Sequence, residues 1–136
     1  MDIQNVELRR AVTSLLFNEG RVLILKRSDK VATQKGKWAG VSGYLEDNEE
    51  PGQRSRQEIA EETGIENPTL IGAGEPIHAR ANEAVWEVHP FLFEVDTREV
   101  TIDWEHVEYQ WIRPEELSNY DCVSRLKRVL GALTEL

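Results

Sequence analysis

The order of the expected elements predicts an α+β fold in which a mixed β-sheet lies between helices. Two observations carry this prediction: extended segments stand on both sides of one helical segment, and a second helical segment ends the chain. A length of 136 residues fits one hydrophobic core and leaves no room for a second. We therefore expect a single domain over residues 1–136.

The chain is expected to begin with a pair of strands. Leu8–Phe17 alternates apolar and polar residues imperfectly, a turn follows at Asn18–Gly20, and Val22–Leu25 has the pattern of a buried strand. The polar segment Ser28–Lys37 contains a glycine and is expected to be a loop. Trp38–Leu45 is then expected to form a short strand, whose glycines permit close approach of another backbone.

One helix is expected in the middle of the chain. It covers Pro51–Thr63, because a Pro-Gly pair opens it and Gly64 suits a left-handed stop. Thr69–Ala73 and Val85–Val95 are expected to be extended, and Gly72–Ala84 is expected to be a loop between them.

The end of the chain is expected to hold one more short strand and a helix. Tyr109–Ile112 has the composition of a strand, Pro114 suits the first turn of a helix, and Asp121 can cap a last amphipathic helix. In that helix the apolar residues repeat at helical spacing: Val123, Leu126, Val129, Leu130 and Leu133.

The net charge argues against one broad class of partner. The chain has 25 acidic and 16 basic residues, a formal charge of −9. Long nucleic acid is an unfavourable partner, because its binding depends on a cationic surface that releases counterions. An acidic protein can still bind the phosphates of a small molecule when metal ions lie between the two.

Membrane and secreted classes are also unfavourable. No apolar run approaches the roughly 18 residues that a membrane span needs. The segment Met1–Asn5 lacks the basic and apolar regions of a signal peptide, and the lone Cys122 has no partner for an internal disulfide. We expect a cytoplasmic enzyme or binding domain. A homodimer is compatible with the sequence, which does not fix the oligomeric state.

The central helix carries an unusual set of carboxylates. Glu58 lies three residues before Glu61 and four before Glu62, so the three share one side of the helix. Each like-charge pair on a helix surface costs roughly 0.2–0.5 kcal/mol. Negative charge in the last turn is also disfavoured by the helix dipole. Crowded hard oxygen ligands suit Mg²⁺, with Mn²⁺ as an alternative, although a solvated acidic face explains the pattern equally well by itself.

These carboxylates fall inside a longer motif. The segment Gly43–Glu49, seven further residues and Gln57–Ile65 resemble the Nudix box, G-x5-E-x7-R-E-U-x-E-E-x-G-U, where U is a bulky apolar residue. The spacing is intact across 23 residues and one fixed position differs. The flanking sequences Leu23–Arg27 and Tyr109–Leu117 look family-like as well.

The resemblance implies a Nudix-type α/β/α sandwich that hydrolyses a nucleoside diphosphate linked to another group. Carried over to this chain, Glu61 and Glu62 would ligate metal, and Glu58 would be a ligand or the base. Gly43 would shape the loop, and Glu49 would brace it against the helix. A bound metal would lower the pKa of its water and neutralise phosphate charge, while a carboxylate takes the proton.

The one departure from the motif is Gln57, where the family has an arginine that pairs with box carboxylates. Glutamine donates a hydrogen bond but carries no charge, so the positioning of these carboxylates is in question. Arg54 lies four residues before Glu58 and seven before Glu61, which places it on the same side of the helix. We expect Arg54 to supply the missing cation, and the alternative is a solvent-facing side chain.

A further carboxylate is expected from a distant loop, because family members often recruit one there. Glu105 and Glu108 lie just before the expected strand at Tyr109. We favour Glu105 as a catalytic base, since it falls in the loop, and an exposed surface glutamate is the alternative for either residue.

Three further side chains are candidates for substrate contact. Arg27 could meet phosphates at the end of its strand, although a solvated side chain is the commoner outcome. Trp38 or Trp86 could stack on a base or sugar ring, although large aromatic residues more often pack in a core.

Two competing functions are less favoured. Isopentenyl diphosphate isomerases share the fold but use a cysteine in the sheet, whereas Cys122 is expected near the last helix. A catalytically weak sensor that binds a nucleotide is consistent with Gln57, but the intact carboxylates favour a hydrolase. A zinc site of His78, His89 and Cys122 has no usual ligand spacing.

The substrate remains open at this stage. The box accounts for metal and phosphates, whereas specificity is expected to come from loops such as Ser28–Lys37 and Gly72–Ala84. These carry no signature for ADP-ribose, dinucleoside polyphosphates, capped RNA or oxidised nucleotides. The expected partner is therefore a small nucleoside diphosphate derivative of undetermined identity.

Overall fold

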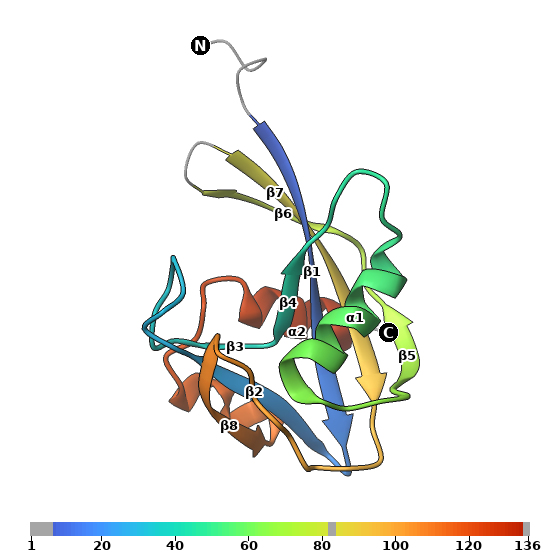
Figure 1. The fold of residues 1–136 in the computed structure, drawn as a ribbon, viewed down its shortest axis with the longest axis vertical. Helices are drawn as coiled ribbons and strands as arrows, with labels where there is room; N and C mark the ends of the chain where they lie inside the picture. The colour runs from blue at the N-terminus through green and yellow to red at the C-terminus, as the bar shows by residue number, and fades with distance from the viewer. Residues whose placement is uncertain (1–6, 82–83, 135–136) are drawn as a thin grey trace.

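The computed structural model describes residues 7–81 and 84–134, so the segment Met1–Asn5 lies outside the described residues. The described elements alternate as expected between strands and helices (Figure 1). In chain order they are β1 (Glu7–Asn18), β2 (Arg21–Arg27), β3 (Trp38–Ala39), β4 (Val41–Tyr44), α1 (Pro51–Thr63), β5 (Thr69–Ala73), β6 (Ile77–Ala81), β7 (Ala84–Glu94), β8 (His106–Ile112), the 3-10 helix η2 (Pro114–Asn119) and α2 (Leu126–Thr134).

The strands form one eight-stranded mixed sheet organised around β1. β1 runs parallel to β7 along almost its whole length and antiparallel to β4 over Ala11–Ser14. It pairs with β2 at its far end, where Phe17 lies opposite Val22. β2 carries β3 and β8, and β7 carries β5 and β6. In Figure 1, β1 and β2 diverge from their shared turn, and β3 and β4 lie between them.

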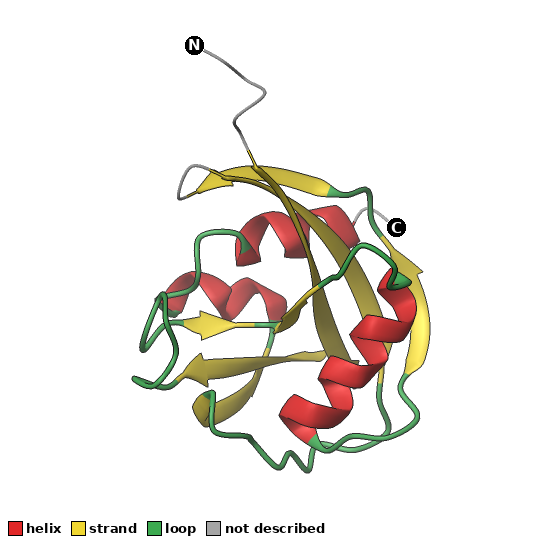
Figure 2. Ribbon diagram, turned by 45° about the horizontal axis from the view of Figure 1, so that its top comes forward, coloured by secondary structure: helices red, strands yellow, loops and turns green. Residues whose placement is uncertain are grey.

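Alternation along β1 divides the core between two helices. Leu16 belongs to the apolar cluster that contains Ile59 of α1, whereas the adjacent Leu15 belongs to the cluster that contains Leu126 of α2. Figure 2 shows the helices on opposite sides of the strands. This arrangement confirms the α+β class and the α/β/α sandwich.

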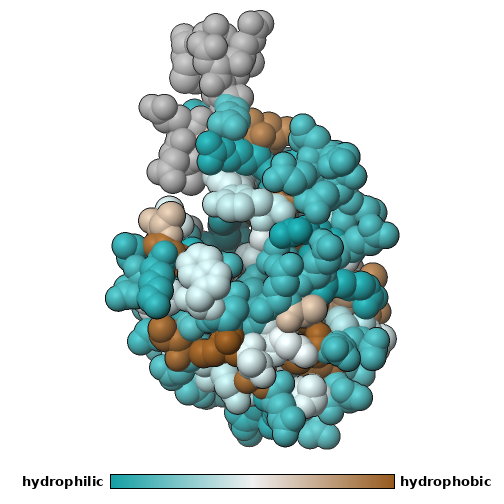
Figure 3. All heavy atoms as spheres, viewed as in Figure 1, coloured by the Kyte–Doolittle hydropathy of each residue, from teal (hydrophilic) through white to brown (hydrophobic). Residues whose placement is uncertain are grey.

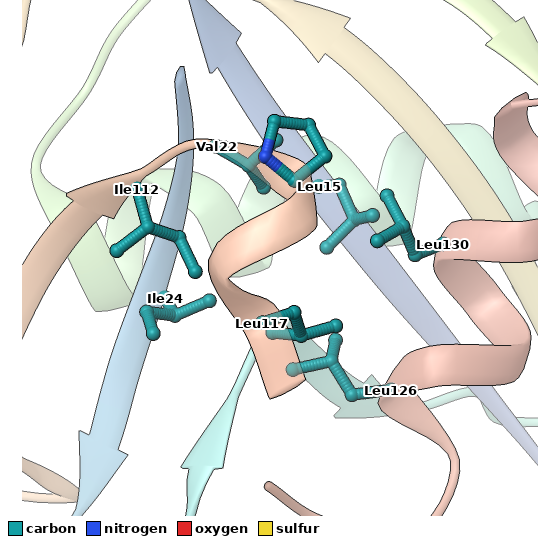
Figure 4. A pocket seen from close by; sticks show the side chains of 8 residues that line it. Leu15, Val22, Ile24, Ile112, Leu117, Leu126 and Leu130 are labelled. Carbon is teal, nitrogen blue, oxygen red and sulfur yellow. The ribbon is translucent and has the colours of Figure 1, made fainter. Parts of the chain in front are cut away.

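The core beneath α2 and η2 is almost closed. Figure 4 shows seven labelled apolar side chains that converge there from β1, β2, β8, η2 and α2, including Leu15, Ile24 and Leu117. The space left between them is about 10 Å³, room for at most about one water molecule. Because the lining is entirely apolar, this gap is a packing defect of the core.

The structure corrects four details of the expected elements. The segment expected as a loop at Gly72–Ala84 contains β6, which pairs with β7. The expected strand Trp38–Leu45 is interrupted at Gly40, where a side chain would lie 3.0 Å from the backbone oxygen of Ser14. β8 begins at His106, earlier than expected. Asp121 does not cap α2, because that helix begins only at Leu126.

Caps define α1. Glu50 precedes the helix, and its carboxylate accepts hydrogen bonds from the backbone N–H groups of Gly52 (3.0 Å) and Gln53 (2.8 Å). Gly64 ends it in the left-handed conformation, with φ of 72°, and donates its N–H to the carbonyl of Ala60. None of the helices in the described ranges is long and apolar enough to cross a membrane.

The same substitution at two glycines should change stability in opposite directions. Gly64→Ala should lower the free energy of unfolding by about 1 kcal/mol, because a side chain disfavours its positive φ. Gly131→Ala should raise it by about 0.5–1 kcal/mol, because Gly131 lies inside α2 with no atom within 4 Å of the added carbon. Urea unfolding measures both values, and equal signs would contradict this account of the cap.

Candidate active site

The inner face of α1 carries two carboxylates into the protein. Glu58 is 6% exposed and Glu62 is 2% exposed, whereas Glu61 is exposed and close enough to Arg54 to raise its pKa. Gly43 of β4 faces the Glu58 carboxyl so closely that a side chain at this position would overlap it. The absence of a side chain at Gly43 is therefore what allows α1 to lie against β4 with Glu58 between them. The outer face of α1 is hydrophilic (Figure 3).

Arg54 reaches the carboxylates of the box. Its Nη2 donates to Oε1 of Glu58, and its Nη1 lies 3.5 Å from Oε2 of Glu49 and 3.3 Å from Oε1 of Gln57. Partial burial acts to lower the pKa of Arg54, but Glu58, Glu49 and Glu61 raise it overall. The expected position of Arg54 on the carboxylate side of α1 is thus what the structure shows, and the solvent-facing alternative is wrong.

Glu49 connects the loop to the helix. Its Oε1 accepts a hydrogen bond of 2.8 Å from the backbone N–H of Glu46, while its Oε2 faces Arg54. These contacts join the two halves of the motif in the way expected of a brace. A polar hollow of about 370 Å³ opens beside them, lined by Asn48, Glu49, Glu50, Gln53, Arg54 and Gln57.

A buried histidine lies behind Glu62. His106 begins β8, with its side chain 2% exposed, and its Nδ1 is 2.8 Å from Oδ1 of Asp103. Its Nε2 is 3.6 Å from Oε1 of Glu62, whose Oε2 is buried without a hydrogen-bond partner among the described residues. The sequence did not indicate this histidine, because only the pairing of β8 with β2 brings it to α1. The position of His106 beside Glu105 was the one available signal.

Glu105 lies on the same side of the protein as Glu62. It is in the loop before β8, as expected, and its carbonyl accepts a hydrogen bond of 2.7 Å from the N–H of Ser28. Burial and the neighbouring Asp103 raise the pKa of Glu105, while His106 and Arg27 oppose that rise.

The carboxylates repel one another strongly at Glu62. Burial raises the pKa of Glu62 well above its ordinary value, and Glu58, Glu105 and Asp103 raise it further. Two segments far apart in the sequence, α1 and the loop before β8, thus bring their acidic residues to one place. Such a cluster is stable when a cation or a proton neutralises it.

The motif suggests one family, and comparison with protein families supports it. The profile of the NUDIX domain family matches residues 7–132. The chain belongs to this family. Membership confirms the resemblance and the expected class of enzyme, a Nudix-type pyrophosphohydrolase acting on acid anhydrides.

Relatives within and around the family agree with the fold. Nucleoside triphosphatase NudI of Escherichia fergusonii is 28% identical over 133 residues, which cover 90% of this chain and 94% of the relative. The crystal structure of MutT protein from Methanosarcina mazei superposes with a TM-score of 0.80 at 23% identity, covering 96% of this chain and 95% of that one.

A larger protein contains a similar domain. The bifunctional NMN adenylyltransferase/ADP ribose pyrophosphatase from Francisella tularensis, solved with AMP and a Mn ion, superposes with a TM-score of 0.81 at 19% identity. The superposition covers 96% of this chain and 42% of that protein. At this identity the similarity concerns the fold alone.

The residues of this Nudix domain fit a divalent metal through their oxygen atoms. No three acidic, histidine or cysteine side chains within 7–81 and 84–134 already converge as a metal site. Mg²⁺ does not require such a cage, because it keeps several waters and binds through one or two carboxylates together with substrate phosphates. The orphaned Oε2 of Glu62, next to Glu58, is a buried acceptor that a cation would satisfy.

Two of the candidate substrate contacts lie in different surroundings. Arg27 donates from Nε and Nη2 to the carbonyl of Thr33, and it lies close enough to Glu105 to influence its pKa. Trp38 is 8% exposed and packs edge-to-face on Tyr120 at 5.3 Å. Trp38 is therefore a core residue, and its burial contradicts a stacking role in substrate binding.

The described residues assemble neither the zinc site nor the reactive cysteine that the sequence left as alternatives. His78 and His89 both contact Glu87, at 3.4 Å and 3.2 Å. Cys122 lies elsewhere, bridged to Trp38 between η2 and α2, and burial raises the pKa of its thiol. These positions support neither the zinc set nor a reactive thiolate at the carboxylate cluster.

Glu62→Gln should stabilise the metal-free protein at neutral and alkaline pH. A carboxyl with a raised pKa in the folded state favours its neutral form, so its charge lowers stability as pH rises above the unfolded value of 4.5. Because a pKa that differs by one between the folded and unfolded states corresponds to about 1.4 kcal/mol, we expect a gain on the order of 1 kcal/mol at about pH 8 in EDTA. Thermal unfolding measures it.

The exposed Glu61 provides the matched control. Glu61→Gln removes the same charge without relieving burial, so it should change stability by less than Glu62→Gln does. The gain from Glu62→Gln should also shrink as pH falls toward 4.5. A Glu62→Gln protein less stable than wild type at about pH 8 in EDTA would contradict the destabilising effect assigned to the Glu62 charge.

Proposed function

We propose that this Nudix enzyme hydrolyses a phosphoanhydride bond in a nucleoside triphosphate or a small nucleoside diphosphate derivative, with Mg²⁺ or Mn²⁺ as cofactor. The observation that carries the proposal is the buried Glu62 beside the buried Glu58: Oε2 of Glu62 has no hydrogen-bond partner among the described residues. The NudI relative, a nucleoside triphosphatase by name, supports the triphosphate class. A cytoplasmic location, a homodimer and the extent of the domain over residues 1–136 stay predictions.

The residues of the chain divide the chemistry between them. Glu58, Glu61 and Glu62 would hold the metal, which when bound supplies neutralisation of phosphate charge and acidification of water. Glu105 would take a proton from the attacking water, and its raised pKa supports this role, because a general base works best with a pKa near the working pH. Glu58 is the alternative base, but Arg54 already holds it in an ion pair. Arg27, next to Glu105, would bind a substrate phosphate.

We further propose that Arg54 replaces the arginine that the motif has at position 57. The three side chains that Arg54 contacts are Glu49, Glu58 and Gln57. Arg54 therefore connects the loop carboxylate to the helix carboxylate, and Gln57 contributes an acceptor to the same guanidinium.

A sensor that binds nucleotide without turnover is the second candidate. Gln57 was the feature that favoured it, because an uncharged residue there leaves the carboxylates unpaired. The contacts of Arg54 remove that argument, and the hydrolase is the better supported function.

Metal-dependent turnover should be visible in a panel of nucleotides. The purified protein should hydrolyse at least one of the nucleoside triphosphates, nucleotide sugars, ADP-ribose and dinucleoside polyphosphates when Mg²⁺ is present, and should stop in EDTA. Glu62→Gln should lose activity by at least about 100-fold, because a ligand to the metal is lost. Phosphorus NMR of the products identifies both the substrate and the cleaved bond.

Glu105→Gln separates the base from the ligands. A general base typically contributes about 100-fold or more, and its loss should lower kcat while leaving metal affinity little changed. Tight binding of a nucleotide without any turnover would instead support the sensor and reject the hydrolase.

The role of Arg54 can be tested by moving the charge back. Arg54→Ala should lower turnover by about 10–100-fold, the usual cost of losing a residue that orients metal ligands. Adding Gln57→Arg to that protein should restore much of the activity, since the charge returns to the position that the motif uses. Steady-state kinetics and metal titration of both proteins give the comparison. Unchanged turnover in Arg54→Ala would show that no compensation occurs.

A further inference from the structure

A second cluster of unusual side chains surrounds Trp86 on β7. The guanidinium groups of Arg9 and Arg125 lie 5.7 Å and 5.5 Å from the centre of its ring system. The Tyr44 ring lies 5.5 Å from the same ring, with the two planes inclined by 30°. The sheet assembles three of these residues, because Arg9 is opposite Trp86 and Tyr44 is paired with Ala11 of β1. Tyr44 is 69% exposed, so most of its ring meets solvent.

Arg125 has no anionic partner in this cluster. Within 7–81 and 84–134, no side chain or backbone group forms a hydrogen bond or ion pair with its guanidinium. Burial lowers the pKa of Arg125, Tyr44 opposes this change, and the nearby cations Arg128 and Arg27 add to it. A half-buried guanidinium that lacks an ion-pair partner and has other cations nearby is unfavourable. Its five donors remain available to an acceptor from outside the chain.

The cluster is continuous with the acidic site. Tyr44 directly follows Gly43, which lies against Glu58. Arg27 is close enough to Glu105 and to Arg125 to influence the pKa of each. Figure 1 shows β4, which ends at Tyr44, between the β6–β7 hairpin that carries Trp86 and the β2–β3 pair. The acidic residues and the aromatic rings are thus neighbours, as the phosphates and the base are in one nucleotide.

We propose that Tyr44, Trp86 and Arg125 form the subsite for the base of the substrate, and that this subsite prefers keto bases to amino bases. The proposal rests on the proposed function and names the part of the nucleotide that it left open. The exposed Tyr44 ring, supported by Trp86, offers a face on which a base stacks. Arg125 has donors and no acceptor, so it recognises a carbonyl oxygen.

The chemistry of the bases gives the direction of selectivity. Guanine presents two adjacent acceptors, O6 and N7, that match the fork of a guanidinium, and uracil and thymine present O4. Adenine and cytosine carry an amino group at the corresponding position, and this group donates. An amino group that faced Arg125 would place its N–H donors against the N–H donors of the guanidinium, so no hydrogen bond would form.

The experiment compares four bases and two arginines. With Mg²⁺ present, the keto-to-amino ratio of kcat/KM should be about tenfold for guanosine over adenosine triphosphate, within the range of one bidentate base contact. For uridine over cytidine triphosphate it should be smaller, because O4 is a single acceptor. Arg125→Lys keeps the charge but loses the fork, and Arg125→Leu loses both. Each should reduce this ratio to about twofold or less, mainly by raising KM for the keto substrates.

Arg128→Leu is the matched control. Arg128 lies three residues after Arg125, in the first turn of α2, and donates to the carbonyl of His78, so its loss removes the same charge from the same region. It should leave the keto-to-amino ratio unchanged. Tyr44→Ala should weaken binding of all four bases by a similar factor, since stacking is tolerant of base identity. Because Tyr44 is exposed, this variant should fold.

Binding of nucleoside monophosphates separates this proposal from the proposed function. Monophosphates have no phosphoanhydride, so calorimetric titration of GMP, UMP, AMP and CMP measures recognition without turnover. Selective binding of GMP and UMP that is lost in Arg125→Leu supports the subsite even if no triphosphate is hydrolysed. Equal affinity for all four, or selectivity that survives in Arg125→Leu, would overturn it and leave Arg125 as a packing partner of Trp86.

Discussion

The burial of Glu58 and Glu62 between α1 and the sheet is the constraint on which the rest of the site depends. A carboxylate taken out of water loses hydration free energy, and two together also repel each other. The fold offsets this in two visible ways: Arg54 pairs with Glu58, and His106 faces Glu62 while held by Asp103. The remaining acceptor of Glu62 has no partner within the described ranges, so stability is given up at the position where the proposed chemistry requires a cation.

The sheet is built so that distant segments meet at this acidic pair. β1 pairs with β4, which brings Gly43 beneath Glu58, and the lack of a side chain at that glycine sets the closeness of α1. β2 pairs with β8, and a register shift between Lys26 and Arg27 ends the ladder at His106. The loop just before β8 therefore lies near the end of α1 that carries Glu62. Packing by the apolar clusters fixes the strands, and the strands fix the distances among the acidic residues.

The sequence predicted those parts of the site that depend on local spacing. Glu58, Glu62 and Arg54 share a helical face because residues four apart lie one turn apart, and Gly64 ends the helix because its φ is positive. The role of His106 could not be predicted in this way, since its contact with α1 depends on the β2–β8 register. The same holds for Trp38, whose burial against Tyr120 depends on how η2 packs. Asp121 failed as a cap because Trp38 donates its N–H to the Asp121 carbonyl, holding this segment in an extended bridge before α2 begins.

The ion pair between Arg54 and Glu58 has the wrong order to be explained by helix stability alone. In an isolated helix the favourable arrangement places the acidic residue four positions before the basic one, and here the basic residue comes first. Arg54 is also near the N-terminus of α1, where the helix dipole disfavours a cation. Both effects act against an arginine at this position. The half-buried contacts of Arg54 with Glu58 and Glu49 outweigh these two unfavourable effects. These contacts hold the carboxylates in place and do not serve to stabilise the helix. This placement supports the proposal that a charge at position 54 performs the task of one at position 57, since Arg54 contacts Gln57 as well as both carboxylates.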